Sequence, residues 1–202
     1  MPISAEKPPF PAFYDDLDLT LEEIFKRLSD GVRNRRSAFH TPALATVTPQ
    51  GAPDVRTMVL RGVETSPLTL RFHTDIRSGK VDQVSQNPNG FCEIYDSNCK
   101  IQLRLTCRMT VLGDGETAER AWSETRAMSR ACYQIETGPG TEIPAPGAAV
   151  YAPERLDEGR ANFAVLMAEV MKMEWLYLAA RGHARARFER GAGDWTGCWL
   201  AP

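Results

Sequence analysis

Residues 100–111 read Lys-Ile-Gln-Leu-Arg-Leu-Thr-Cys-Arg-Met-Thr-Val, and apolar and polar side chains alternate along the stretch. Such alternation predicts an antiparallel β-strand with one face in a core. The apolar face carries Ile101, Leu103, Leu105, Cys107 and Met109. The other face carries the polar residues Gln102, Arg104, Thr106, Arg108 and Thr110.

Segments on both sides of this strand extend the β pattern. Strands are predicted at 43–48, 55–63, 68–73 and 91–95, and a C-terminal hairpin at 183–188 and 195–200. Residues 55–63 are apolar on both faces, which predicts a strand buried between two layers. Residues 163–180 fit a helix or a strand by periodicity alone.

Three helices and two irregular segments complete the pattern. Thr20 and Glu23 form a capping box before an apolar stripe, Ser78 is a good N-cap for a short second helix, and a third helix covers 116–126. Residues 136–160 form a long Gly/Pro-rich loop, and residues 1–14 form an extended Pro-rich arm. We therefore expect a mostly β fold in one domain, residues 15–202, with an antiparallel barrel of about seven strands and helices packed outside it.

Composition excludes several classes of protein. A net charge of -2, without interleaved aromatic and basic residues, argues against a nucleic-acid binder. No apolar run is long enough to span a membrane, and the first residues lack the apolar core of a secretory signal. The 5 cysteines include no C-x-x-C pair and the 3 histidines are scattered, so we expect reduced thiols, no metal site and a cytoplasmic location.

Two stretches carry the chemistry. Residues 56–61, Arg-Thr-Met-Val-Leu-Arg, place a cation at each end of a predicted buried strand, where each cation needs an anionic partner. Residues 72–80 join a strand end to a helix start, and Ser78 and Lys80 there predict an anion site. Each feature alone has a simpler structural explanation, such as an ordinary helix cap. The order and spacing of these features together are more specific than any one of them.

Taken together, these stretches resemble the pyridoxamine 5'-phosphate oxidase-like flavoproteins, the FMN-binding split-barrel family. The resemblance runs from about residue 39 to residue 202 and includes Asn87-Pro88, Gln102 and the closing residues 199–202. It implies a six-stranded antiparallel barrel, a homodimer with FMN at the subunit interface, and a strand over 163–180.

The resemblance also assigns residues to the cofactor. It implies that Arg56 and Lys80 hold the FMN phosphate and that residues 57–60 lie along the isoalloxazine, largely through backbone groups. The full set of cofactor contacts it implies is Arg56, Thr57, Met58, Val59, Leu60, Arg61, His73, Thr74, Ser78, Lys80, Gln102, Tyr177 and Arg187. Of these, Gln102 and Arg187 would reach the flavin or its phosphate partly from the second subunit.

The chain departs from the family where the oxidase grips its phosphorylated substrate. The expected Tyr and Arg fall at Ala121 and Thr125, while Ser129 is retained. On the hairpin the expected Arg and His appear in swapped order, as His183 and Arg185. We therefore expect a small-molecule substrate other than pyridoxamine 5'-phosphate, in a pocket made more apolar by three nearby residues, Trp122, Met128 and Tyr133.

The leading hypothesis is an FMN-dependent oxidoreductase whose catalytic residues the sequence does not reveal. The alternatives are a flavin-binding carrier or sensor without turnover, and a relative that binds the deazaflavin F420 or heme on the same barrel. The spectrum of the bound chromophore would separate these hypotheses.

Overall fold

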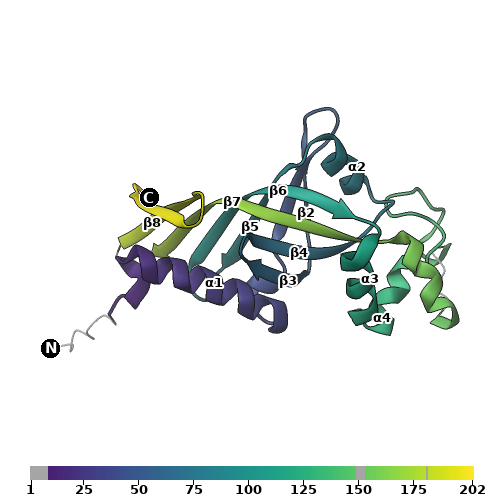
Figure 1. Cartoon of the computed structure of the whole chain (residues 1–202), viewed down its shortest axis with the longest axis horizontal. Helices are drawn as coiled ribbons and strands as arrows, with labels where there is room; N and C mark the ends of the chain where they lie inside the picture. The colour runs from purple at the N-terminus through teal and green to yellow at the C-terminus, as the bar shows by residue number, and fades with distance from the viewer. Residues whose placement is uncertain (1–8, 149–152, 181) are drawn as a thin grey trace.

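The computed structural model describes residues 9–148, 153–180 and 182–202, which form one antiparallel sheet with helices around it (Figure 1). In these ranges nine strands are joined in the order β2-β1-β5-β6-β7-β4-β3, with β8 on β7 and β9 on β8. The strands are β1 Ala43–Val47, β2 Pro53–Thr57, β3 Leu60–Thr65, β4 Leu68–Asp75, β5 Asn89–Asp96, β6 Ile101–Leu112, β7 Phe163–Ala179, β8 Gly182–Arg190 and β9 Trp195–Leu200. The α-helices are α1 Leu17–Arg33, α2 Gly79–Gln86, α3 Gly115–Glu124 and α4 Ala127–Arg130.

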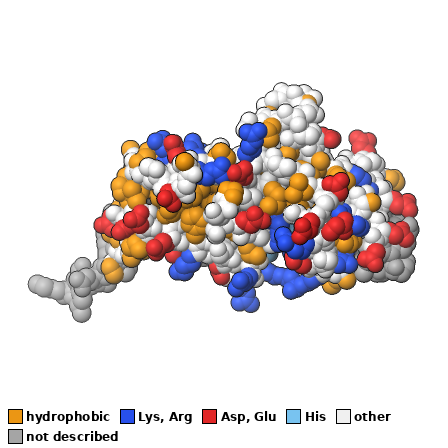
Figure 2. All heavy atoms as spheres, in the orientation of Figure 1, with side chains coloured by type: hydrophobic (Ala, Val, Ile, Leu, Met, Phe, Trp, Pro, Cys, Tyr) orange, Lys and Arg blue, Asp and Glu red, His pale blue; other side chains and the backbone are white. Residues whose placement is uncertain are grey.

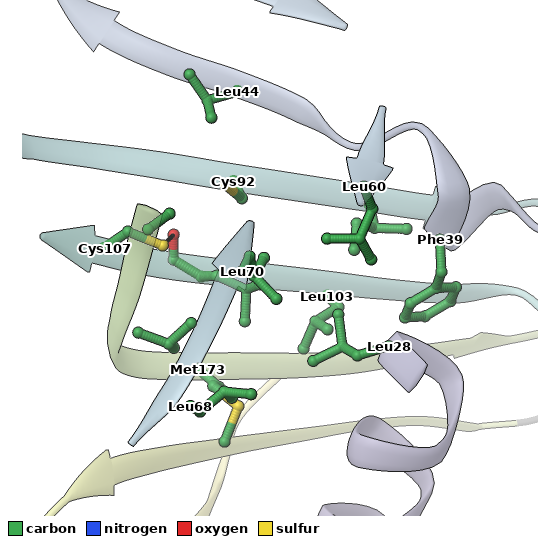
Figure 3. Close-up of a cluster of buried hydrophobic side chains, with 14 of the residues drawn as sticks. Leu28, Phe39, Leu44, Leu60, Leu68, Leu70, Cys92, Leu103, Cys107 and Met173 are labelled. Atoms are coloured by element: carbon green, nitrogen blue, oxygen red, sulfur yellow. Dashed lines mark hydrogen bonds between the residues drawn. The ribbon is translucent and has the colours of Figure 1, made fainter. Parts of the chain in front are cut away.

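The alternating stretch forms β6, as predicted. Its apolar face is buried, with Ile101, Leu103 and Leu105 fully inside the core that Figure 3 shows. Its neighbours are β5 on one side and β7 on the other. Residues 163–180 are therefore strand, as the family resemblance implies and as periodicity alone could not decide.

β7 divides the sheet into two parts. On one edge it pairs with β6 over most of its length. On the other edge it pairs first with β4, through residues 163–169, and then with β8, through residues 172–179. The β8–β9 hairpin consequently lies at one end of the molecule, far from α2, α3 and α4 at the other end (Figure 1).

Helix α1 covers the core with an apolar stripe in which Ile24 and Leu28 have no exposed surface. Its N-cap is Asp16, whose side chain accepts a hydrogen bond from Leu19 N at 3.0 Å. The predicted capping box is wrong, because Thr20 lies inside the helix and donates to the carbonyl oxygens of Phe13 and Asp16, each at 2.7 Å. The N-cap is therefore Asp16, one helical turn before the predicted Thr20.

The prediction of one strand over 55–63, buried between two layers, is also wrong. The chain leaves β2 after Thr57, where Met58 N donates to Pro42 O at 2.9 Å, and β3 begins at Leu60 beside a different neighbour, β4. One face of β2 is uncovered in the single chain, with Val55 60% exposed. Residues 55–63 thus supply two strands, which is one reason why the described residues hold nine strands rather than six or seven.

The two segments expected to be irregular contain local structure. Residues 1–8 and 149–152 lie outside the described residues. Pro146–Ala148 form a 3-10 helix inside 136–160, and a second 3-10 helix, Pro153–Asn162, overlaps the end of that segment, so it is not one continuous loop. Ala12–Tyr14 form a 3-10 turn, and the Phe13 ring packs edge-on against Trp175 at 5.4 Å.

Candidate functional site

A polar cluster forms where β4 ends and α2 begins. We call it the Lys80 cluster and define it as Thr46, Asp54, Arg56, Thr74, Ser78, Lys80 and Gln83. The Lys80 Nζ donates to Ser78 Oγ at 2.8 Å and to Thr74 Oγ1 at 3.1 Å. Ser78 is the N-cap residue of α2, but its hydroxyl donates to Asp75 O at 2.7 Å instead of capping the helix. The Ser78 oxygen is thereby oriented to accept from Lys80.

Arg56 enters the same cluster from β2. Its Nη1 donates to Thr46 Oγ1 at 2.7 Å, and its Nη2 lies 2.5 Å from Asp54 Oδ2 and donates to Gln83 Oε1 at 3.2 Å. The Gln83 Nε2 donates in turn to Asp54 at 2.9 Å. The acidic partner of the partly buried Arg56 is therefore Asp54, two residues earlier in β2.

Sequence reasoning missed three members of this cluster, which are Thr46, Asp54 and Gln83. Thr46 faces Asp54 across the β1–β2 pair, and Gln83 lies about one helical turn after Lys80. The spacing of Lys80 and Gln83 on α2 was a readable signal. The β1–β2 register that brings Thr46 to Arg56 was not readable from the sequence.

The cluster holds two cations close together. Burial and the positive charge of Arg56 lower the pKa of Lys80, against the opposing effect of Asp75 and Asp54. Within the described ranges no carboxylate lies within ion-pair distance of Lys80, which is bonded only to hydroxyl groups. A half-buried ammonium with neutral partners is a favourable place for an added anion.

A second site lies on the other side of β4, and we call it the arginine cavity. Its volume is about 400 Å³. It is lined by Val32, Arg33, Arg35, His40, Arg61, Arg71, His73, Glu124, Thr125, Arg126 and Ser129. The structure thus brings together Arg61, His73 and Ser129, which the sequence analysis placed at the cofactor or the substrate.

His73 is one of the titratable groups that line this cavity. Its ring stands 4.9 Å, edge to face, from Phe163, and its Nδ1 lies 3.4 Å from Thr125 Oγ1. Burial, followed by the charges of Arg61 and Arg71, lowers the pKa of His73 to about 4. The imidazole is therefore neutral at physiological pH.

Arg56 and Arg61 belong to two different sites. They are separated because β2 ends at Thr57, β3 begins at Leu60, and the pairing of β3 with β4 shifts register between Leu60 and Gly62. Between them, the side chains of Met58 and Leu60 are buried in the core. Residues 57–60 can therefore offer a ligand chiefly backbone groups and the side chains of Thr57 and Val59.

The remaining expected contacts do not belong to the Lys80 cluster. They lie on β6, β7 and β8, beside residues 174–178 of β7, and β8 is at the opposite end of the molecule from α2 in Figure 1. Gln102 donates to Glu93 Oε1 at 3.0 Å, Arg185 pairs with Glu174 at 2.7 Å, and Arg187 lies 3.2 Å from Glu189.

His183 lies at the start of β8, where it pairs with Leu178 of β7. Tyr177 pairs with Ile101, on the core face of the sheet, and packs against Phe13 and Tyr14. One copy of the chain thus does not bring these residues to the sites around β4.

The three residues that were expected to make a substrate pocket more apolar lie outside the arginine cavity. Trp122 and Tyr133 pack against Phe163 in a small buried cluster of their own, and Met128 is 85% exposed. None of these residues lines the arginine cavity, whose walls are mainly polar and cationic. Arg126 does line the cavity. It directly follows Thr125, the position at which the oxidase pattern expects an arginine.

Other kinds of site find no support in the described residues. These ranges contain no group of three or more His, Cys, Asp or Glu side chains that could hold a metal ion. Across the same ranges no helix is both long and apolar enough to cross a membrane. Positive and negative side chains are interspersed over the face shown in Figure 2.

Comparison with known sequences finds similarity to pyridoxamine 5'-phosphate oxidases in each case. Residues 22–113 match the family model described as "Pyridoxamine 5'-phosphate oxidase, FMN-binding domain". The chain is 28% identical over 169 residues to pyridoxine/pyridoxamine 5'-phosphate oxidase 2 of Arabidopsis thaliana, covering 78% of this chain and 83% of that protein. It is 26% identical over 181 residues to the pyridoxine/pyridoxamine 5'-phosphate oxidase of Sphingopyxis alaskensis, covering 79% and 76%.

Solved structures agree with this match. A pyridoxamine 5'-phosphate oxidase-related, FMN binding protein from Nostoc punctiforme superposes with a TM-score of 0.75 at 25% identity, covering 96% of this chain and 100% of that one. PhzG from Burkholderia lata superposes with a TM-score of 0.73 at 20% identity, covering 96% and 98%, and so shares the fold.

Proposed function

We propose that the chain is an FMN-dependent oxidoreductase of the pyridoxamine 5'-phosphate oxidase-like FMN-binding split-barrel family, in keeping with its similarity to the family model, to the curated oxidases and to the solved structures. The observation that carries this proposal is the Lys80 cluster. A half-buried ammonium, a guanidinium and two hydroxyls meet there at the start of a helix, and such donors suit a phosphate dianion.

We propose FMN rather than FAD. The cluster offers one compact set of donors, Arg56 with Thr74, Ser78 and Lys80, which fits one phosphate group. Charge-assisted contacts contribute roughly 1.5–3 kcal/mol each, so a few of them suffice for firm binding. The sequence has no G-x-G-x-x-G motif of the kind that holds a dinucleotide.

The working form is a homodimer with FMN at the subunit interface. Gln102, Tyr177 and Arg187 lie at the far end from the Lys80 cluster, so only a second copy could bring them to it. The uncovered face of β2, with Val55, is an apolar surface that a partner would bury. A symmetric twofold dimer would yield two equal sites.

Bound FMN supplies the redox step, as a two-electron hydride acceptor or donor. The residues of this chain bind and orient it. Lys80, Ser78 and Thr74 hold the phosphate, while Arg61 and His73 border the arginine cavity, where a substrate would lie.

The substrate is a small molecule other than pyridoxamine 5'-phosphate. Ala121, at the place of the expected Tyr, is 1% exposed and packs in a buried cluster, so it offers no group to a ligand. His183 and Arg185 stand in the reverse of the order in the oxidase pattern. We place the protein in the cytoplasm, in keeping with the free state of its cysteines in the described ranges.

The test is the spectrum and mass of whatever the purified protein carries. We expect flavin absorption and release on denaturation of a compound with the mass of FMN, and reduction of that flavin by a hydride donor. Release of FAD, F420 or heme, or failure to bind FMN added in excess, would contradict the proposal. Bound FMN that no hydride donor reduces would instead indicate a carrier or sensor.

A further inference from the structure

The turn between β4 and α2 is tied to a segment far along the chain. Arg77 lies in this turn, and its side chain donates to two backbone carbonyl groups, from Nη2 to Ile135 O and from Nη1 to Glu136 O, each at 3.0 Å. The acceptors come shortly after α4, which lies at the same end of the molecule as α2 (Figure 1). One guanidinium therefore joins the start of α2 to the segment that follows α4.

The same guanidinium also holds Asp75, the last residue of β4. Arg77 Nε donates to Asp75 Oδ1 at 2.9 Å and Nη2 donates to Asp75 Oδ2 at 2.7 Å, so the pair is bidentate. Asp75 Oδ1 also accepts from the Arg77 backbone N at 2.9 Å. Asp75 is only 8% exposed, so this pair is largely shielded from solvent. The backbone of residues 75–77 is thereby held in one arrangement.

Hydrogen bonds continue from Asp75 to the ammonium of Lys80. The carbonyl oxygen of Asp75 accepts from Ser78 Oγ at 2.7 Å and from Ser78 N at 3.1 Å. Because the single hydroxyl hydrogen of Ser78 is used in this way, its oxygen accepts from Lys80 Nζ at 2.8 Å. The Arg77 guanidinium is thus linked through two residues to the cation of the proposed phosphate site.

A second contact holds the same turn against the same part of the chain. Ile76 N donates to Asn162 O at 2.8 Å, and Asn162 Nδ2 donates to Tyr133 O at 2.7 Å. Residues 76 and 77 are therefore both attached to the region around residues 133–136. Loss of the Arg77 side chain leaves the Asn162 contact in place, so we expect such a variant to fold with a less firmly held turn.

We infer that Arg77 is a positioning residue for the cofactor phosphate, because it fixes the turn that places Ser78 and Lys80. The Arg77 side chain makes four hydrogen bonds within the protein, to Asp75 and to the two carbonyl groups, and so acts on the phosphate through Lys80. This inference rests on the proposed function. It goes beyond the cofactor contacts implied by the family resemblance, which do not include Arg77.

The test compares FMN with riboflavin, which lacks the phosphate, by fluorescence titration. The ratio of the two Kd values measures what the phosphate contributes to binding. Arg77→Ala should raise the Kd for FMN by roughly threefold to tenfold, up to the loss of one charge-assisted contact, and should leave the Kd for riboflavin nearly unchanged. General damage to the fold would weaken both flavins equally, so equal losses for both would overturn the inference.

The matched control is Arg130→Ala. Arg130 also donates to backbone carbonyl groups near α4, but these belong to residues 122, 123 and 125 rather than to the segment bound by Arg77. We expect Arg130→Ala to keep the wild-type ratio of the riboflavin and FMN Kd values. A ratio lowered as much as in Arg77→Ala would show that any loosened arginine in this region has the same effect, and would overturn the inference.

A double-mutant cycle tests whether Arg77 acts through Lys80. Residues that act through one another give non-additive effects. In a Lys80→Ala background, Arg77→Ala should therefore have little further effect on the Kd for FMN. A full additional loss in the double variant would mean that Arg77 acts independently of Lys80, which contradicts the positioning role.

Hydrogen exchange of the flavin-free protein supplies a measurement that needs no cofactor. Arg77→Ala should speed amide exchange over residues 75–80, where Ser78 N donates to Asp75 O, and over residues 133–136 as well. Lys80→Ala should leave residues 133–136 at the wild-type rate, because Lys80 lies at the other end of the chain of hydrogen bonds. Unchanged exchange over residues 75–80 in Arg77→Ala would overturn the inference.

The outcomes separate this inference from the proposed function. If the wild type takes up no FMN, the proposed function fails, and the exchange rates alone then support or overturn the positioning role of Arg77. If Lys80→Ala weakens FMN binding but Arg77→Ala leaves the ratio of the two Kd values unchanged, the phosphate site stands and the inference about Arg77 fails.

Discussion

The ammonium of Lys80 lies 2.8 Å from the hydroxyl of Ser78, two residues earlier in the turn that opens α2. Ser78 is available for this contact because it does not cap its own helix and donates to Asp75 O instead. A cation and a polar hydroxyl are thus held together at a helix N-terminus, where backbone N–H groups also favour an anion. This small arrangement is the basis of the flavin proposal.

Asp54 competes with a phosphate for Arg56. Its carboxylate lies 2.5 Å from Arg56 Nη2, and hydrogen bonding by Gln83, with the charges of Arg56 and Lys80, lowers the pKa of Asp54 and keeps it ionised. Asp54→Asn removes that negative charge but can still hydrogen-bond to Gln83. We expect this variant to bind FMN severalfold more tightly in a fluorescence titration, whereas weaker binding would mean that Asp54 orients Arg56 for the phosphate.

The protein should be a dimer in solution. The sites around β4 lack the contribution of Gln102 and Arg187, which flank residues 174–176 of β7, beyond the part of β7 that pairs with β4. Sedimentation equilibrium at micromolar concentration should give twice the chain mass of 22.5 kDa, with one flavin per chain. A flavin-loaded monomer under these conditions would refute the interface proposal.

Pyridoxamine 5'-phosphate should be a poor substrate. The buried Ala121 replaces a Tyr, and losing one charged or polar contact to phosphate costs roughly 1.5–3 kcal/mol, about tenfold or more in kcat/KM. Arg126 offsets part of this loss, because it lines the cavity. Steady-state oxidation measures the outcome, and turnover with a micromolar KM would show that the remaining contacts suffice.

His73 should make the folded protein sensitive to acid. Its pKa is lowered to about 4 in the folded state, so between pH 6.5 and 4 the unfolded chain binds a proton that the folded chain does not. The free energy of unfolding should therefore fall as the pH falls through this window, by up to roughly 3 kcal/mol from this residue.

Urea unfolding at several pH values measures this slope. His73→Phe keeps the ring contact with Phe163 and cannot titrate, so its stability should decline less over the same window. Identical pH slopes for wild type and variant would show that His73 does not carry the effect.

Local patterns in the sequence were sufficient to predict much of the fold. The alternation along β6 was readable because one face is buried and the other is not. The N-terminus of α1 was misread because Asp16 and Thr20 are both good capping residues, and only the tertiary structure selects between them. The break between β2 and β3 was invisible because apolar residues continue through it.

The candidate site was predictable only in part, for a similar reason. Ser78 and Lys80 are neighbours in sequence, so their contact followed from a helix start. Gln83 follows Lys80 by about one turn of α2, but Asp54 joins them from β2, which no sequence spacing connects to α2. The arginine cavity depends on Arg71, whose side chain fits only because Gly62 and a register shift leave space for it.

Equilibrium titration of FMN into Lys80→Ala tests whether Lys80 forms the phosphate site, with Lys26→Ala as the matched control. The Lys26 side chain is 78% exposed on α1 and forms only a surface pair with Glu23. The account predicts that Lys80→Ala raises the Kd for FMN by about tenfold to a hundredfold without lowering the thermal stability of the flavin-free protein, while Lys26→Ala matches the wild type. Equal FMN affinity in all three proteins would contradict a phosphate site at Lys80.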